Sequence, residues 1–354
     1  MNAGQIWWGQ IGNSLKLLTQ VTNALRDCHS AVLQVSPKLP WRQVFYGMVD
    51  LRRSAFSGGR RLVRLPWTEG MEPGEFVLEE LCSRTTRAEY WPGETCGAYL
   101  ARKDDIVLND YYVWVTGIHR KEDLSQWMGF LSQYVQHSPE HGQRAVFILE
   151  YDGAPTETMG TKKIDYAVED YDCRVFCLEL AAALRNTDLR NYQAELAQCI
   201  CGIDPELCAL LLEAGAPLLS DPVSTVQKVI STAKDPEGRP FAVRTEQQIT
   251  SAAWHAGIVL MFPVLERYRM DLVSKHEADL ASHLPISNSN GDKITDPYDL
   301  EIGPISYIIA QSDKNYSRDE VEGIRICRKA RNLLAHNKPL PYEDVVKIDQ
   351  LSRR

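Results

Sequence analysis

The stretch that decides the fold class of the C-terminal part is Ser317–Asn337, which reads SRDEVEGIRICRKARNLLAHN. Its opening serine and the glutamate three residues later form a capping box, in which each side chain accepts a hydrogen bond from the other residue's backbone N–H. Asn337 suits the left-handed residue after a helix, and Pro339 and Pro341 prevent continuation. The pattern therefore predicts a helix over 318–336.

Apolar residues recur at helical spacing along this stretch and indicate one side that faces a core. This predicted apolar stripe consists of Gly323, Ile326, Cys327, Ala330, Leu333 and Leu334. The predicted solvated face consists of Arg325, Lys329, Asn332 and His336. A helix with one apolar stripe and one basic face is typical of a helical bundle.

The last six residues of the predicted helix are Arg331-Asn-Leu-Leu-Ala-His336. Five residues at 100° each place Arg331 and His336 roughly 140° apart around a straight helix. The two side chains meet if the long arginine arm curls round, if the last turn unwinds, or if a second copy supplies one of them. The Arg and His of this hexapeptide also have a simple structural explanation without any catalytic role, because cations near a helix C-terminus interact favourably with its dipole.

The Arg-Asn-x-x-x-His signature on a capped helix resembles the HEPN superfamily of helical-bundle ribonucleases and toxins. Its surroundings add to the resemblance, since Asp299–Gly303 leads into the preceding helix and Pro341–Val346 opens a short final helix. The resemblance covers about the last 110 residues, counted from the turn-rich boundary that ends at Pro240. It implies metal-independent cleavage of RNA, usually in a homodimer that brings two copies of the motif into one cleft.

Carried over by position, the resemblance makes Arg331 and His336 the catalytic pair and Asn332 the polar residue beside them. Histidine can take a proton from a ribose 2′-hydroxyl or give one to the leaving 5′-oxygen near neutral pH. Arginine stays charged, and its planar fork of donors fits phosphate oxygens. No metal or other cofactor is required for this chemistry.

A net charge of −8 excludes a general nucleic-acid coat protein but leaves room for a local basic cleft. The residues predicted to bind RNA are Arg325, Arg328, Lys329 and Lys338. Some HEPN-like domains are non-catalytic. Two functions are therefore compatible with the sequence: a toxin or anti-phage ribonuclease, and a scaffold subunit of a bacterial defence or regulatory complex.

The rest of this domain is predicted to be helical. Residues 245–282 carry apolar positions at helical spacing and indicate one or two long helices bent near Pro263. Residues 284–298 indicate a polar loop. The apolar run that follows suits a helix beginning at Pro304.

Residues 1–155 show a different sequence pattern, in which short apolar runs alternate with amphipathic segments. The predicted strands are Ser30–Val35, Arg61–Leu65, Tyr111–Ile118 and Arg144–Tyr151. The predicted helices between them include Glu75–Cys82 and Glu122–Val135. Strand and helix in alternation indicate an α/β domain with a parallel sheet. The order resembles the nucleotide-binding core of AAA+ and related P-loop ATPases.

The phosphate-binding motif of those ATPases is missing. After Ala31–Val35 the chain reads Ser36-Pro-Lys-Leu-Pro-Trp41, and prolines have no N–H to donate to a phosphate. The third strand ends without an acidic pair that would hold magnesium. The resemblance therefore implies a pseudo-ATPase, which could dock on an active ATPase or another protein of a defence operon, or sense a ligand. An α/β domain that is unrelated to nucleotide-binding proteins fits the sequence equally well.

Between these domains, residues 156–235 are predicted to be a helical, lid-like segment with breaks near Thr187, Gly202 and Gly215. A turn over Lys234–Pro240 ends it, and the HEPN-like domain occupies 240–354. The tryptophans at positions 7 and 8 are expected to lie before the first helix and to pack against a domain.

Nine cysteines, an odd number without Cys-x-x-Cys pairs, indicate reduced thiols in a cytoplasmic protein. Five of them cluster at Cys173, Cys177, Cys199, Cys201 and Cys208. Their spacing matches no common zinc pattern and no histidine lies among them, so core thiols are expected. The N-terminus lacks the features of a signal peptide, and no membrane association is expected.

Overall fold

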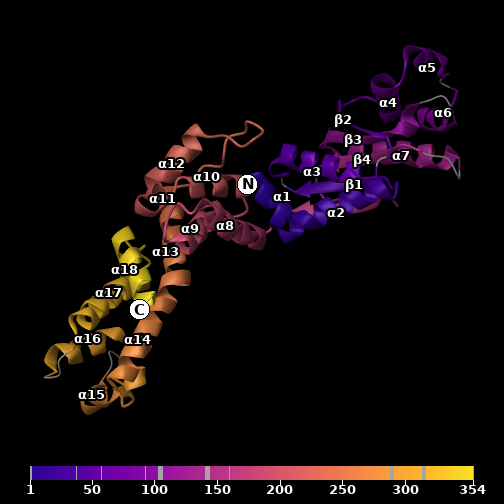
Figure 1. Ribbon diagram of the computed structural model, residues 1–354. Coiled ribbons are helices and arrows are strands. Elements are labelled where there is room, and N and C mark those ends of the chain that lie inside the picture. Colours follow the sequence, from indigo (N-terminus) through magenta and orange to yellow (C-terminus); the bar gives the residue numbers. More distant parts are fainter. Residues whose placement is uncertain are drawn as a thin grey trace. The chain divides into compact units, whose positions relative to one another are not determined.

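The computed structural model describes the chain except for residues 1, 37, 57, 92, 103–106, 140–143, 159, 288–290, 313–315 and 354. The chain divides into two compact units, residues 1–172 and 173–354 (Figure 1). The first is an α/β unit and the second is almost entirely helical.

A five-stranded parallel sheet forms the centre of the first unit; the sequence predicts the parallel arrangement and four of the five strands. Its strands are β1 (Ala31–Ser36), β2 (Arg61–Pro66), β3 (Tyr111–Ile118), β4 (Val146–Tyr151) and β5 (Lys162–Ala167). Their order across the sheet is β2-β3-β4-β1-β5. Every residue of β4 is buried, which explains why the central strands appear in the sequence as continuous apolar runs.

The fifth strand was not predicted, because its sequence mixes charged and apolar residues. β5 pairs with β1 at the edge of the sheet, and its two fully buried side chains are Ile164 and Tyr166. An edge strand with one side toward solvent carries a weak apolar signal. The unit therefore extends beyond residue 155 and closes at Asp172.

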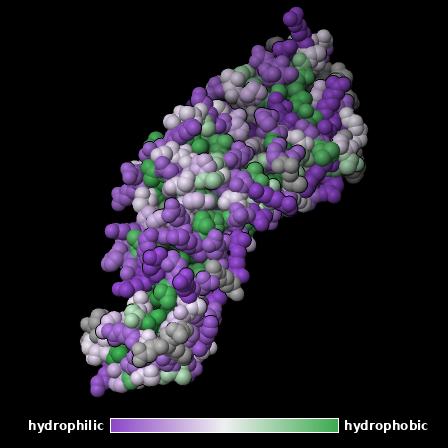
Figure 2. All heavy atoms as spheres, turned by 60° about the vertical axis from the view of Figure 1, so that its left-hand side comes forward, coloured by the Kyte–Doolittle hydropathy of each residue, from purple (hydrophilic) through white to green (hydrophobic). Residues whose placement is uncertain are grey.

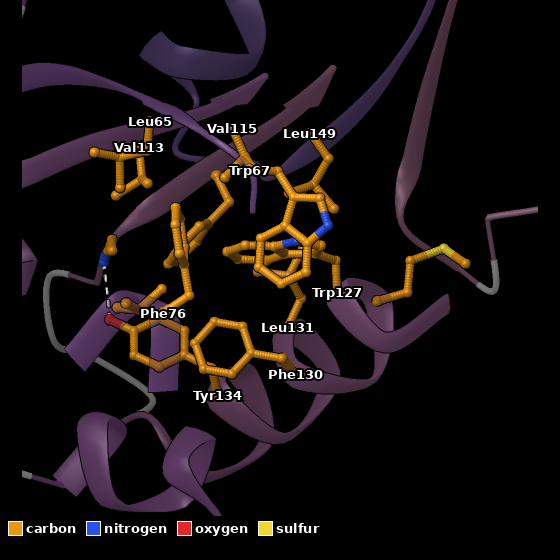
Figure 3. Close-up of a cluster of buried hydrophobic side chains, with 14 of the residues drawn as sticks. Leu65, Trp67, Phe76, Val113, Val115, Trp127, Phe130, Leu131, Tyr134 and Leu149 are labelled. Atoms are coloured by element: carbon orange, nitrogen blue, oxygen red, sulfur yellow. Dashed lines mark hydrogen bonds between the residues drawn. The ribbon is translucent and has the colours of Figure 1, made fainter. Parts of the chain in front are cut away.

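One set of strand side chains packs under the helices α4 (Pro73–Leu81), α6 (Cys96–Arg102) and α7 (Lys121–His137), and α5 (Arg84–Glu89) packs on α4. Val113, Val115 and Leu149 point into this core, where the Trp67 and Trp127 rings meet edge to face at 5.2 Å (Figure 3). Aromatic edge-to-face contacts add to the apolar area that they bury.

Strand residues of opposite parity point to the other side of the sheet. There lie α1 (Ala3–Gln10), α2 (Gly12–Arg26) and α3 (Arg42–Ser54). Trp7 and Trp8 are fully buried, as expected, but they belong to α1 rather than preceding the first helix. The Asn2 side chain caps α1. This capping signal is short, and the strongly apolar Trp7-Trp8 pair makes it hard to recognise in the sequence.

The first half of the second unit follows the predicted breaks. Its helices are α8 (Asp170–Leu184), α9 (Arg190–Cys201), α10 (Pro205–Glu213), α11 (Ala216–Ser220) and α12 (Pro222–Thr232). Gly202 and Gly215 adopt positive φ at two of the breaks. The turn over Lys234–Pro240 closes with a backbone bridge between its ends.

A long helical run follows, composed of α13 (Glu246–Ala256), a π-helical segment (Gly257–Met261) and α14 (Phe262–Lys275). The π segment directly precedes Pro263, where the missing N–H interrupts the regular hydrogen-bond pattern. The Phe262 N–H donates to the Gly257 carbonyl five residues back. A π-helical segment therefore lies next to Pro263, where the sequence predicts a bend.

The remaining helices are α15 (Glu277–Ser282), α16 (Ile302–Gln311), α17 (Arg318–Ala335) and α18 (Tyr342–Ser352). Helix α16 begins at Ile302 rather than at Pro304, because proline is tolerated throughout a first helical turn, where its N–H has no partner in the helix. The predicted polar loop holds a short antiparallel pair, β6 (Ile286–Ser287) with β7 (Lys293–Ile294).

The run Glu246–Lys275 is long and apolar enough to cross a membrane by length and composition. Core helices of soluble proteins have the same composition, and this run packs against α9, α17 and α18. Hydrophilic side chains cover most of the face of the protein presented in Figure 2.

Candidate functional site

Helix α17 carries the Arg331–His336 motif and is fixed at both ends as predicted. The Glu320 N–H donates to Ser317 Oγ at 3.2 Å, and the Ser317 N–H donates to Glu320 Oε2 at 2.8 Å. At the other end His336 is the C-cap residue and Asn337 has φ 54°. The Lys338 N–H donates to the Leu333 carbonyl at 3.0 Å, which completes a Schellman motif.

The buried side of α17 follows the predicted apolar stripe with one addition. Gly323, Cys327, Ala330 and Leu334 are buried, Ile326 and Leu333 are half-buried, and Ile324 is buried as well. Trp254 on α13 donates its indole N–H to the Leu334 carbonyl at 2.8 Å. This bond ties the last turn of α17, and with it the motif, to the long helical run.

Arg331 forms an ion pair across to the residue just before α16. Its guanidinium Nη2 lies 2.5 Å from Glu301 Oε2, and the two side chains are 36% and 65% exposed. An ion pair this open to water contributes about 0–1 kcal/mol. Glu301 falls within the Asp299–Gly303 segment, but no local pattern in the sequence indicates that it contacts the motif.

His336 and Asn332 are exposed on the solvated face. Within the described part of the chain, no hydrogen bond or ion pair joins Arg331 to His336. The two predicted catalytic residues therefore stay apart on a single copy of the helix, as their angular separation requires.

The four cations predicted to bind RNA are all exposed, but they differ in their partners. Arg325 pairs with Glu322 at 2.9 Å, and Lys329 pairs with Asp344 at 2.7 Å. The other two, Arg328 and Lys338, have no ion-pair partner among the described residues. The basic face is thus partly neutralised by its neighbours.

A hollow of about 750 Å³, lined mostly by residues of polar type, opens beside the end of the motif. Trp254 and Asn337 line it together with residues from the first turns of α13. The lining residues from α13 and its cap are Thr245, Glu246, Gln247, Thr250 and Ser251. Asn337 follows His336 directly, so the hollow adjoins the motif.

In the first unit, the segment after β1 is packed rather than open. Leu39 and Pro40 are buried, and Trp41 adopts φ 43° as the N-cap residue of α3. The Trp8 indole donates to the Pro40 carbonyl at 2.8 Å. A Cβ at Gly4 would lie 2.9 Å from Trp41 Cγ, so α1 packs closely over this turn.

Two amides in the first turn of α3 are already used within the helix. The Val44 and Phe45 N–H groups donate to the Trp41 carbonyl at 2.9 and 3.1 Å. A phosphate cradle needs several free amides at this position. The described part of this turn therefore lacks the arrangement on which a P-loop depends.

A buried carboxylate does lie at the carboxyl end of β4. Glu150 is 3% exposed and accepts from the Tyr46 hydroxyl at 2.7 Å and from the Trp114 indole at 2.9 Å. Arg42 pairs with its other oxygen at 3.2 Å. Burial, together with the negative charge of Glu150, raises the pKa of Tyr46 well above its ordinary value. With three partners, Glu150 joins α3 to the sheet rather than facing a ligand.

Comparisons with known proteins do not assign this chain to a family. No family model matches the chain, and no curated protein matches it. Among solved structures, the crystal structure of Cdc6p from Pyrobaculum aerophilum aligns over 98% of this chain and 95% of that chain, at 11% identity and a TM-score of 0.35. A TM-score of this size does not establish a common fold. The evidence for the parallel sheet is the pairing of its strands in the structure.

Proposed function

We propose that the C-terminal part of this chain is a metal-independent endoribonuclease of the HEPN type, with Arg331 and His336 as its catalytic pair. The observation that carries the proposal is the end of α17, where His336 stands exposed at a fully capped terminus held by Trp254. A solvent-facing histidine on a backbone held in this way is suited to proton transfer with a bound nucleic acid.

In the proposed reaction, His336 takes the proton from a ribose 2′-hydroxyl as that oxygen attacks the neighbouring phosphorus. The bond from phosphorus to the 5′-oxygen breaks, and this oxygen takes up a proton. The products are a 2′,3′-cyclic phosphate and a 5′-hydroxyl. Arg331 stabilises the charge that develops on the phosphoryl oxygens, and Asn332, one turn from His336, orients the histidine or the phosphate.

Arg331 must leave Glu301 to reach a phosphate in this reaction. The exchange costs little, because both members of the ion pair are open to water. A phosphate then replaces the carboxylate as the partner of the same guanidinium fork. Since Arg331 and His336 diverge on one helix, the proposed active form is a homodimer in which two copies of the motif share a cleft.

RNA would approach along the exposed basic residues of α17 and the loop that follows. Arg328 and Lys338 supply unpaired charge, and Arg325 and Lys329 supply charge that phosphates can compete for. The hollow beside Asn337 offers the Trp254 ring and polar groups to a base next to the cleaved bond.

For the N-terminal unit we propose an ATPase-like module that does not hydrolyse nucleotide. The parallel strand order β2-β3-β4-β1-β5 is consistent with an AAA-type core, whereas the packed turn at Trp41 replaces the phosphate loop. Such a module would regulate the ribonuclease or dock on a partner ATPase, as in toxin and anti-phage defence systems.

The test uses purified full-length protein and single-stranded RNA in the presence of a chelator. Wild type is expected to produce 2′,3′-cyclic phosphate ends. Arg331→Ala and His336→Ala are each expected to lower the rate by about 100-fold or more. Arg328→Ala, a matched exposed cation on the same helix, is expected to lower it only a few-fold.

A second function, a non-catalytic scaffold, is favoured by the pairing of Arg331, Arg325 and Lys329 with acidic neighbours. Expression of wild type and the two motif variants in bacteria separates the alternatives. If total RNA stays equally intact and growth is equal for all three, with and without neighbouring genes, the ribonuclease proposal is wrong and the scaffold stands.

A further inference from the structure

Helices α9 and α13 bring together three side chains of the kinds that bind transition metals. Glu195 and Cys199 lie one turn apart on α9, and His255 lies near the end of α13. One carboxylate oxygen, the thiol sulfur and one imidazole nitrogen all lie within 4.8 Å of one another. The sequence places His255 far from the cysteines along the chain, so spacing alone does not reveal the cluster.

The packing of the two helices explains the juxtaposition. Residues at i and i+4 share one face of a helix, which aligns Glu195 and Cys199. Helix α13 packs directly on α9, and its buried residues Ala252, Ala253 and Ala256 are small enough to permit close approach. His255 sits among these alanines in the sequence, and its side chain reaches the same pair of residues on α9.

We propose that Glu195, Cys199 and His255 form a binding site for a divalent transition-metal ion, with zinc as the best fit. Zinc prefers thiolate, imidazole and carboxylate ligands in tetrahedral geometry, and three protein ligands leave the fourth position to water. Tetrahedral zinc bonds of about 2.0–2.3 Å separate donor atoms by about 3.5 Å. A small rotation of the exposed His255 side chain would close the cluster to that size.

The carboxylate of Glu195 is held in an orientation that suits this role. The side chain is buried, and Arg174 on α8 pairs with Oε2 at 3.0 Å. The other oxygen, Oε1, faces the Cys199 thiol at 3.9 Å. A carboxylate oriented by a second residue while one oxygen points at the ligand cluster is the usual arrangement around metal sites.

Exposure rises across the three residues, from buried Glu195 through half-buried Cys199 to exposed His255. A metal ion would therefore enter from solvent on the His255 side. The neighbouring cysteines differ, since Cys173, Cys177, Cys201 and Cys208 are buried core thiols as expected. Cys199 is the exception to that expectation, and it is the one cysteine of the five that meets a histidine and a carboxylate.

The experiment titrates chelator-treated, reduced full-length protein with Co²⁺, followed by competition with Zn²⁺. Cobalt in a thiolate site gives a sulfur-to-metal charge-transfer absorption in the near ultraviolet and intense ligand-field bands in the visible when it is tetrahedral. Wild type is expected to show both at one equivalent, and zinc is expected to abolish them. Zinc should also raise the thermal midpoint, because it binds the folded state.

Three variants assign the ligands. Cys199→Ser is expected to remove the charge-transfer absorption, and His255→Ala and Glu195→Gln are each expected to weaken zinc binding about tenfold or more. Cys28→Ser, which removes an exposed thiol of the first unit, is the matched control and should change neither.

Substitution of Glu195 or Cys199 on α9 can disturb the fold. His255 is exposed, so His255→Ala leaves the core intact and still tests the site. Circular dichroism of each metal-free variant verifies the fold. Cobalt spectra without charge transfer in wild type, or zinc affinity unchanged in both His255→Ala and Cys199→Ser, would overturn the site. Neither result bears on the proposed ribonuclease, whose residues lie on α17.

Discussion

At the scale of single residues, the ion pair between Arg331 and Glu301 bears most directly on the proposed chemistry. Glu301→Gln removes the charge that competes with a phosphate for Arg331 and leaves the side chain nearly the same size. We expect kcat/KM for RNA cleavage to rise by about fivefold or less, because an exposed ion pair is worth at most about 1 kcal/mol.

Initial rates on a short RNA check this expectation. Glu322→Gln serves as the control, because it frees Arg325, which contributes charge but is not a catalytic residue. A decrease in rate for Glu301→Gln would mean that the carboxylate positions Arg331 for catalysis rather than competing for it.

The cap residue Glu320 is a second residue with a measurable effect. Burial disfavours its charge, but Lys275, His276 and Ser317 donate to it and hold its pKa well below the ordinary value of 4.5. A lowered folded-state pKa stabilises the protein above the unfolded value. That stabilisation is lost as pH falls from about 4.5 through the folded-state pKa.

Glu320→Ala is therefore expected to lower the free energy of unfolding by about 1–2 kcal/mol at pH 7. The difference from wild type should shrink as the pH falls below about 4. Urea denaturation of both proteins across this range measures it. A difference that stays constant down to pH 3 would show that the charge of Glu320 contributes nothing.

At the scale of elements, the close approach of α17 to α14 depends on a glycine. A Cβ at Gly323 would lie 2.2 Å from the Tyr268 hydroxyl, which itself donates to the Glu320 carbonyl. Gly323→Ala should therefore destabilise α17 by about 1–3 kcal/mol, even though alanine favours helix. Gly303→Ala, which meets open space on α16, should cost nothing or stabilise slightly.

Hydrogen exchange over residues 318–335 gives the local readout. Faster exchange in Gly323→Ala but not in Gly303→Ala is the expected pattern. The double variant Gly323→Ala with Tyr268→Ala separates the causes, because removal of the ring relieves the steric conflict. Equal exchange in all of these proteins would contradict the packing of α17 on α14.

At the scale of the whole molecule, the proposed dimer makes a prediction that no single chain can satisfy. If Arg331 from one copy works with His336 from the other, a mixture of Arg331→Ala and His336→Ala proteins regains activity. Equal mixing makes half of the dimers mixed, each with one intact site of two, so about a quarter of the wild-type rate is expected.

Light scattering and mixing after brief unfolding and refolding provide the measurement. Each variant alone is the control and should stay inactive. A strict monomer at micromolar concentration would rule out the two-copy cleft. A dimer without recovery on mixing would assign both catalytic residues to the same chain.

Local signals made much of the fold predictable. The strands β1, β3 and β4 at the centre of the sheet are largely apolar runs, and the glycines at positions 202 and 215 interrupt the helices where expected. The edge strand β5 and the N-terminal α1 lack such strong signals, because one mixes charge with apolar residues and the other is dominated by buried tryptophans.

The sequence alone is enough to place α17, because its caps, apolar stripe and stop signals all lie within the helix or next to it. It also determined that no phosphate loop follows β1. By contrast, the pairing of Glu301 with Arg331 and the approach of His255 to Glu195 and Cys199 are visible only in the folded chain. Capping and periodicity act over one or two turns, whereas these contacts join residues 30 and 60 positions apart, which only helix packing brings together.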